Sequence, residues 1–582
     1  MASPAPQPES RTFWRAPLAS FLAVVAIVWA RVLAEPITPY GSNGSAFIEH
    51  AHRVTVLARI RGWLFEGDPH RFHHLVDELD QAFPPLLHLL AAPLTLLFDG
   101  AIEPVVLASV LWVGVLALGV GATARGLGGG PVAVSAAMTA AIWLPGVHGP
   151  ATRYYYDLPM AALCFVTTGA LTLLWTERPW RAGVVGGVLG FLACILKWTA
   201  LPFLAFMFAG LALTKPPPLR HRLGALGLSA AVLGGAVGAF LALAGSENSL
   251  LATTRESATE AVTGDQFGLV RAATGLLPAL LTPDPLRATR LDQNTLGLVF
   301  SVFSPLLALA TAVLLGVWLL RSRRGLAFVL ATAGGQFAFL VLWVRPIDER
   351  FHLVLAPALV LGAAFGWETL EPRVRRSLGP ALLGVAALVA LDFHHAPTTA
   401  LTQLWTASPR WGVAFDRFPP PVRPRGFGAT TSAQGRGWVR RDEEWPFRGP
   451  LRDALIAEIR ACRPAQIAAE SSGPWLHEDG SHDWLAWELA RDWVRESSLR
   501  PPAIIALPVA AGPGRDDPVR CDEAEPLEER VVVLAAARVG GPPPPPRCPA
   551  EAAWRHLATV DDPEGGPGVA LWSPFGVEVC SR

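Results

Sequence analysis

The stretch RYYYDLPMAALCFVTTGALTLLWT, residues 153–176, decides the class of fold. Three of the four tyrosines of the chain stand in it, between Arg153 and Asp157, and an uncharged apolar run follows from residue 158 to residue 176. An apolar run of about 18 residues or more is typical of a helix that crosses a membrane. The stretch therefore predicts a spanning helix that begins directly after a polar, tyrosine-rich segment.

Apolar runs of this kind recur along the chain as far as residue 393. Of the 582 residues 51% are hydrophobic and 16% are charged, a composition that is rare in soluble proteins of this size. The 48 basic and 48 acidic residues cancel, so the chain has no overall basic field for nucleic acid. The apolar runs cover residues 17–33, 85–98, 103–122, 130–146, 158–176, 182–196, 199–213, 222–244, 296–320, 326–344, 352–370 and 378–393.

Basic residues in the short loops predict the topology, because such loops stay on the cytoplasmic side. The first run follows Arg11 and Arg15 and lacks a small-residue cleavage site, so we expect a retained span with a cytoplasmic N-terminus. If every run spans the membrane, the basic loops lie on the outer side, which conflicts with this rule. We therefore interpret residues 83–98, which contain three prolines and His88, as an interfacial or re-entrant segment.

The expected fold is a polytopic α-helical membrane protein of the inner (plasma) membrane with about eleven spans. The first domain is residues 1–393, and its long first outer loop is residues 36–102. The second domain, residues 394–582, is polar and contains apolar runs such as PPAIIALPV and RVVVLAAARV, which favour an extracytoplasmic α/β domain. Its four cysteines suggest disulfides, with three possible connectivities.

Polar residues at the predicted outer boundary are candidates for a site. Charges at a membrane boundary are functional candidates by default, and Arg and Lys side chains bind phosphate by charge-assisted hydrogen bonds. The alternatives are an aromatic belt for the tyrosines and snorkelling for the cations. The candidates for binding a lipid phosphate are Arg153, Tyr154, Tyr155, Tyr156, Lys197, Arg345 and Arg350.

Four motifs in this order resemble the GT-C membrane glycosyltransferases, in particular the protein O-mannosyltransferase and aminoarabinose transferase-like branch, glycosyltransferase family 39. The first is the PPL segment, residues 83–86, and the second is the Arg/Tyr-rich stretch that runs into Asp157-x-Pro159. The third is a glycine-rich span that ends in Lys197, and the fourth is Arg350-Phe351 before the span with Pro357-Ala358-Leu359. The resemblance covers residues 15–395 and implies a GT-C-like fold.

The resemblance implies transfer of a sugar from a polyprenyl phosphate to an acceptor at the outer face, where a first-loop carboxylate acts as general base. The family has an aspartate shortly after the first span, whereas this chain has Glu49 there. Asp77, Glu78 and Asp80 are further candidates for the base, and Asp157 matches the second outer-loop aspartate of the family. If Glu49 is not a base, the chain is a divergent or inactive relative.

No soluble cofactor is expected, because the chain has no P-loop and no glycine-rich dinucleotide motif in strand–helix context. A divalent metal is an alternative, with His50, His70 and His74 as candidate ligands. The expected partners are the polyprenyl-linked sugar, the bilayer and an acceptor that is a protein, lipid A or a glycan. A transporter or flippase of lipid-linked precursors is the competing function, although the chain shows no internal repeat.

Overall fold

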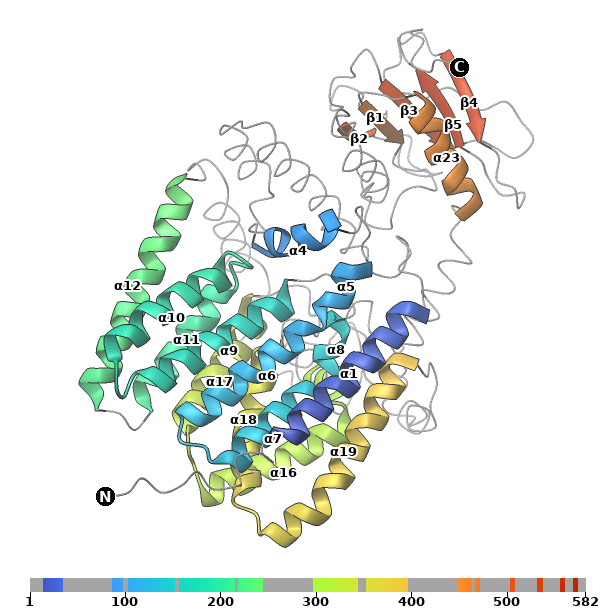
Figure 1. Cartoon of the computed structure of the whole chain (residues 1–582). Helices are drawn as coiled ribbons and strands as arrows, with labels where there is room; N and C mark the ends of the chain where they lie inside the picture. The colour runs from blue at the N-terminus through green and yellow to red at the C-terminus, as the bar shows by residue number, and fades with distance from the viewer. Residues whose placement is uncertain are drawn as a thin grey trace. The chain divides into compact units, whose positions relative to one another are not determined.

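The structure is a computed structural model, and its helices and strands are shown in Figure 1. By its contacts the chain forms two compact units, one of residues 1–36, 76–91 and 103–435, and one of residues 37–75, 92–102 and 436–582. The predicted boundary at residue 394 stays a prediction. The residues that the structure describes are 14–34, 86–97, 103–151, 156–214, 218–243, 297–343, 352–395, 449–462, 466–470, 503–507, 531–536, 555–560 and 569–573.

The first unit is helical, and its helices follow the apolar runs of the sequence (Figure 1). In chain order they are α1 (Arg15–Ala34), α4 (Leu86–Leu97), α5 (Glu103–Ser109), α6 (Leu111–Gly126), α7 (Pro131–Ile142), α8 (Pro145–Ala151), α9 (Asp157–Leu174), α10 (Pro179–Cys194), α11 (Ala200–Leu213), α12 (Leu219–Leu243), the π-helix η3 (Gly297–Phe303), α16 (Pro305–Arg321), α17 (Leu326–Trp343), α18 (Leu355–Glu368) and α19 (Pro372–His395). The predicted helical membrane protein is therefore confirmed.

Eleven apolar helical segments in the described part correspond to the predicted spans. Four of them are long and apolar enough to cross a membrane, namely Leu107–Gly126, Asp157–Leu174, Leu219–Phe240 and Pro372–Leu391, and seven are shorter. Residues 83–98, predicted to be interfacial or re-entrant, contain the short helix α4 with Pro93 inside it. The number of spans and the side on which each terminus lies stay predictions.

The run 296–320 differs from the expectation of one helix. It forms η3, then Ser304 with a φ of 68°, and then α16, which begins at Pro305. Proline disfavours the α conformation of the residue before it, so Ser304 leaves the helix and caps the next one. The Ser304 hydroxyl accepts a hydrogen bond from the Leu307 N–H at 3.5 Å.

Close packing joins α6 and α9. A Cβ on Gly119 would lie 2.6 Å from the backbone nitrogen of Val166, and one on Gly169 would lie 2.6 Å from the Ala122 Cβ. Glycine on both helices thus lets the two backbones approach closely, as is common between membrane helices. The hydroxyls of Thr123 and Thr168 lie 3.1 Å apart across this contact, and both side chains are buried.

The described residues near the C-terminus form α23 (Gly449–Cys462) and the strands β1 (Gln466–Glu470), β2 (Ala503–Leu507), β3 (Val531–Ala536), β4 (Arg555–Val560) and β5 (Val569–Ser573). The sheet has the order β2-β1-β3-β5-β4, in which β1 pairs parallel with β2 and β3, and β5 pairs antiparallel with β3 and β4. Cys462 is disulfide-bonded, as an exported domain would allow.

Candidate functional site

The helices α9 and α10 form an antiparallel hairpin that sets the position of the site. Their lengths are 18 and 16 residues, and a short turn connects Leu174 to Pro179. Because the two helices rise equally per residue, the start of α9 must meet the chain just beyond the end of α10. Asp157 is the first residue of α9, and Lys197 follows the last residue of α10 by three positions.

Asp157 and Lys197 form a buried ion pair at this end of the hairpin. The Lys197 Nζ donates to the Asp157 Oδ1 at 2.6 Å, and the side chains are 12% and 2% exposed respectively. The carboxylate lies at a helix N-terminus and the ammonium lies just past a helix C-terminus, which is where the two helix dipoles favour each charge. Two candidates that stand 40 residues apart in the sequence therefore meet in one site.

The second carboxylate oxygen of Asp157, Oδ2, is buried and has no hydrogen-bond partner among the described residues. A buried polar atom without a partner costs free energy, so such atoms are rare unless a ligand or water binds them. Asp157 thus keeps one acceptor for a group that is not part of the described chain.

The PPL segment reaches the same place. The Leu86 N–H at the start of α4 donates to the Ile195 carbonyl at 3.1 Å, two residues before Lys197. Prolines at 84 and 85 have no N–H, so Leu86 is the first residue after them with a backbone donor to offer. Three of the four motifs that carry the family resemblance therefore lie side by side: the end of PPL, Asp157 and Lys197.

Tyr156 precedes Asp157 and is 1% exposed. A tyrosine of an aromatic belt presents its ring to the membrane interface, whereas Tyr156 is packed inside the protein. The aromatic-belt alternative therefore does not describe this tyrosine.

Most of the other predicted site residues lie outside the described residues. These are Arg153, Tyr154, Tyr155, Arg345 and Arg350 of the phosphate candidates, Glu49, Asp77, Glu78 and Asp80 of the carboxylates, and His50, His70 and His74 of the metal candidates. Within the described ranges no group of three or more His, Cys, Asp or Glu side chains is placed to hold a metal.

His148 is a buried polar residue close to this site in the sequence, and it belongs to none of the four motifs. It lies in α8, in the connection between α7 and α9, and its Nε2 donates to the Ile142 carbonyl at 2.8 Å. Burial lowers the pKa of His148 to about 4, although the bond to Ile142 acts in the opposite direction, so the ring is neutral at pH 7. A histidine in the otherwise small and apolar segment LPGVHGPA is the signal that could have identified it.

The pair suits the recognition of an anionic group at the end of the bundle. An ammonium group has three donors, and one of them binds Asp157. The Asp157 carboxylate holds the lysine in place through Oδ1, and its buried, unpaired Oδ2 is a potential acceptor for a hydroxyl group. A phosphate ester that leaves as an anion needs this kind of positioned positive charge.

Known structures match the chain over nearly its whole length, while no protein-family model and no curated protein matches it. ArnT from Cupriavidus metallidurans in the apo state matches with a TM-score of 0.53 at 16% identity, over 98% of this chain and 100% of that chain. The same protein bound to undecaprenyl phosphate matches with a TM-score of 0.54 at 13% identity, over 97% and 99%. The archaeal oligosaccharyltransferase AglB from Archaeoglobus fulgidus has a TM-score of 0.45 at 14% identity, over 86% and 69%.

At this identity the likeness to ArnT concerns the fold. It agrees with the expectation from the four sequence motifs, three of which meet around Lys197. The chain is thus a multi-pass membrane protein that shares the fold of ArnT.

Proposed function

We propose that this protein is a membrane glycosyltransferase that transfers a sugar from a polyprenyl-phosphate carrier to an acceptor at the outer face of the inner (plasma) membrane. The observation that carries the proposal is the buried pair of Lys197 and Asp157, joined by Leu86 of the PPL segment, in a chain with the GT-C fold. A fold alone does not define an activity, whereas a largely buried cation paired with a buried carboxylate is a site with a specific chemistry.

Lys197 is the residue that would bind the donor phosphate. During transfer the acceptor oxygen bonds to the anomeric carbon, and the bond between that carbon and the phosphate oxygen breaks. The electron pair of the broken bond stays on the phosphate, and the Lys197 ammonium stabilises this charge. The ArnT structure with undecaprenyl phosphate supports a lipid phosphate as the ligand of this fold.

Asp157 would position Lys197 through Oδ1 and face the reactants through Oδ2. The proton of the acceptor hydroxyl must go to a carboxylate, and Glu49, Asp77, Glu78 and Asp80 stay the candidates for this general base beside Asp157. Arg153, Tyr154, Tyr155, Tyr156, Arg345 and Arg350 would complete the binding of the donor phosphate. The proposal requires no metal or other cofactor.

The test measures sugar transfer in membranes that contain a pool of polyprenyl-phosphate sugars, with wild type and the variants Lys197→Met, Asp157→Asn and Glu49→Gln. We expect Lys197→Met to lower the rate of transfer by about 100-fold or more, as the loss of one transition-state donor does. Arg324→Met is the control for removing the cation of an ion pair, because Arg324 lies 2.7 Å from Glu368 and the two side chains are 42% and 22% exposed. Rates are compared at equal amounts of folded protein, because Lys197→Met also lowers stability.

Loss of transfer in Glu49→Gln, with expression and folding intact, would identify Glu49 as the base. Transfer that survives in Glu49→Gln and is lost in Asp157→Asn would direct the search to Asp77, Glu78 and Asp80. A wild type that transfers no sugar from any donor but moves the donor lipid across the membrane would overturn the proposal in favour of the flippase alternative.

A further inference from the structure

A basic surface lies at the end of the first unit where α16 and α18 terminate. The end of α16 and the turn after it contribute three arginines, and the start of α19 contributes three more. Five of these six side chains are exposed, and Arg375 is half-buried. The basic surface consists of Arg321, Arg323, Arg324, Arg373, Arg375 and Arg376.

Hydrogen bonds join the two segments that form the basic surface. The Arg324 Nη1 donates to the Glu368 Oε2 at 2.7 Å, and the Arg321 Nη1 donates to the Thr369 carbonyl at 3.5 Å. The Trp318 Nε1 donates to the Arg324 carbonyl at 2.9 Å and so holds the backbone of the turn after α16. The six arginines therefore belong to one assembled surface and not to two independent loops.

The turn after α16 has an arginine at a position where the backbone favours glycine. Arg323 has a φ of 51°, and its N–H donates to the Trp318 carbonyl at 2.9 Å, as in a helix C-terminal cap. Glycine is the usual residue in this conformation because it has no Cβ, so the guanidinium at position 323 is kept at a cost in backbone strain. Strained residues of this kind cluster where a side chain has a function.

The basic surface carries more positive charge than the carboxylates beside it can neutralise. Its six arginines stand against two glutamates in the same two segments, Glu368 and Glu371. Arg324 pairs with Glu368, and in the described part of the chain no carboxylate forms an ion pair with Arg373 or Arg376. A helix N-terminus favours anions, so the cations at the start of α19 are uncompensated until an anion binds beside them.

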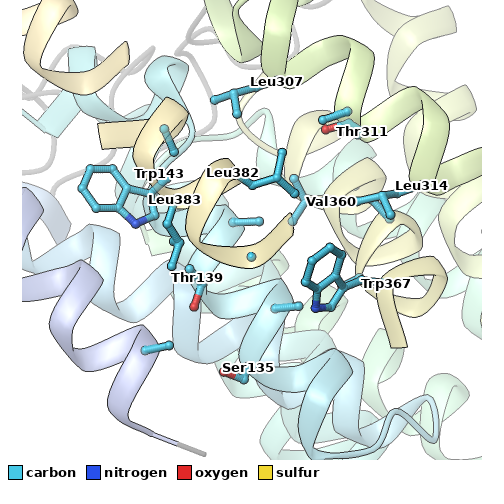
Figure 2. A pocket seen from close by; sticks show the side chains of 18 of the residues that line it. Ser135, Thr139, Trp143, Leu307, Thr311, Leu314, Val360, Trp367, Leu382 and Leu383 are labelled. Carbon is cyan, nitrogen blue, oxygen red and sulfur yellow. The ribbon is translucent and has the colours of Figure 1, made fainter. Parts of the chain in front are cut away.

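Apolar side chains next to the arginines place the basic surface at the level of the lipid head groups. Leu320 is 84% exposed and Leu378 is 46% exposed, and exposed leucines of a membrane helix face hydrocarbon. An apolar cavity along α7, lined by residues of α1, α7, α16, α18 and α19, also reaches this end of the bundle, where Trp367 and Gly379 line it (Figure 2). The anion that suits the arginines is therefore one at the boundary of the bilayer, the phosphate of a lipid.

The basic surface lies far from Asp157. A Cβ on Gly130, in the turn between α6 and α7, would touch the Glu368 carboxylate, and a Cβ on Gly126 of α6 would touch Thr172. Thr172 is near the end of α9, whereas Asp157 begins that helix, about 22 Å away at 1.5 Å per residue. The basic surface is therefore distinct from the proposed site for the donor phosphate.

We infer that the basic surface binds the head group of an anionic phospholipid of the phosphatidylglycerol class. The guanidiniums of Arg373 and Arg376 donate to the phosphate oxygens, and the other arginines add to the positive potential around them. Phosphatidylethanolamine carries an ammonium group that the arginines repel, so it binds less well. By the predicted topology the lipid belongs to the cytoplasmic leaflet, whose negative charge attracts basic segments. This inference does not depend on the proposed transfer activity.

The test mixes the full chain, purified in detergent, with equal amounts of phosphatidylglycerol and phosphatidylethanolamine that have the same acyl chains. Native mass spectrometry measures the ratio of the two bound lipids, and wild type should favour phosphatidylglycerol. Arg373→Gln combined with Arg376→Gln should lower this ratio by roughly 20-fold, about fivefold for each arginine. Both side chains are exposed, so the variant should fold like wild type.

Arg178→Gln combined with Arg220→Gln is the matched control. Both are exposed arginines near other turns, and their removal changes the net charge of the chain by the same amount. Arginines that only set the topology would make the two double variants alike, whereas the inference predicts an unchanged ratio in the control. Arg373→Lys combined with Arg376→Lys keeps both charges and should stay within about threefold of wild type.

Three results would overturn the inference. One is equal binding of the two lipids by wild type, and another is an equal fall of the ratio in both glutamine double variants or in neither. The third is a fall in Lys197→Met with no fall in the Arg373 and Arg376 double variant, because the bound lipid would then lie at the other end of the bundle.

Discussion

The helices α9 and α12 are both long and apolar enough to cross a membrane, yet the protein uses them differently. In α9 72% of the spanning window is buried, whereas in α12 only 22% is buried. The polar residues of α9 are inside, including Asp157, Thr167, Thr168 and Thr172. In α12 the glycines at 224, 227, 234, 235 and 238 have no neighbouring atom within 4 Å of a Cβ built on them.

The difference is that α9 is packed closely on several sides, whereas α12 is not. α9 is held by α6, α10 and α11 and carries one half of the buried ion pair, so any shift of α9 would separate Asp157 from Lys197. α12 packs mainly on α10 through Gly183 and Gly187 and leaves its other face exposed. The helix that positions the site is therefore constrained on several sides, and the peripheral helix is not.

The largest effect on stability should come from breaking the ion pair at the start of α9. Lys197→Met leaves the Asp157 carboxylate buried without its cation and should lower the free energy of unfolding by about 3–5 kcal/mol. Thermal unfolding in detergent measures this, and the double variant Lys197→Met with Asp157→Leu should recover much of the loss. The more exposed ion pair of Arg324 and Glu368 is the comparison, because Arg324→Met should lower the free energy of unfolding by at most about 1 kcal/mol. Equal losses in the two single variants would contradict the comparison.

The second effect is a pH dependence at the connection that leads into α9. Burial lowers the pKa of His148 to about 4, so between about pH 6.5 and 4 the unfolded chain binds a proton that the folded chain does not. The contribution of His148 to stability is therefore fully present above about pH 6.5 and is lost as the pH falls toward 4, by about 3 kcal/mol in total. Melting temperatures across this range should show the fall. His148→Gln should flatten it and His221→Gln should not, and a fall of the same size in His148→Gln would refute the assignment.

A smaller effect should follow from adding one methyl group between α6 and α9. The Cβ of Gly119→Ala would lie 2.6 Å and 2.8 Å from backbone atoms of Val166 and Phe165, which can move only if the helices separate. We expect a loss of about 1–3 kcal/mol in the free energy of unfolding, as for other overpacked sites. Unfolding by heat in detergent measures it, and a neutral result would mean that α6 and α9 are less tightly packed than the structure shows.

The smallest effect should be the same substitution in α12. Gly234→Ala meets no atom within 4 Å, and alanine favours a helix by up to about 1 kcal/mol over glycine. The variant should be as stable as wild type or slightly more stable in the same measurement. A clear loss would indicate that something in the membrane or a second chain contacts this face.

The sequence predicted the helices well, because whether a segment enters the membrane depends mainly on its own apolar composition. Each apolar run from 103–122 to 378–393 contains a described helix, although 103–122 and 130–146 each include parts of two helices. The run 296–320 is divided at Ser304, directly before Pro305. The candidate residues Asp157 and Lys197 also came from the sequence, because charges stand out at the ends of apolar runs. The sequence did not predict that they bind each other, although the nearly equal lengths of α9 and α10 contain that information.

The tertiary structure alone decided the remaining features. The contact of Leu86 with Ile195, the burial of Tyr156 and the neutral state of His148 depend on which segments pack together, and a single sequence does not record this. The cavity along α7 depends on side chains from five helices that fail to fill the space between them. Hydropathy acts residue by residue and fixes which segments become helices, whereas packing is a property of many residues at once, so pairs, burial and cavities emerge only when the helices assemble.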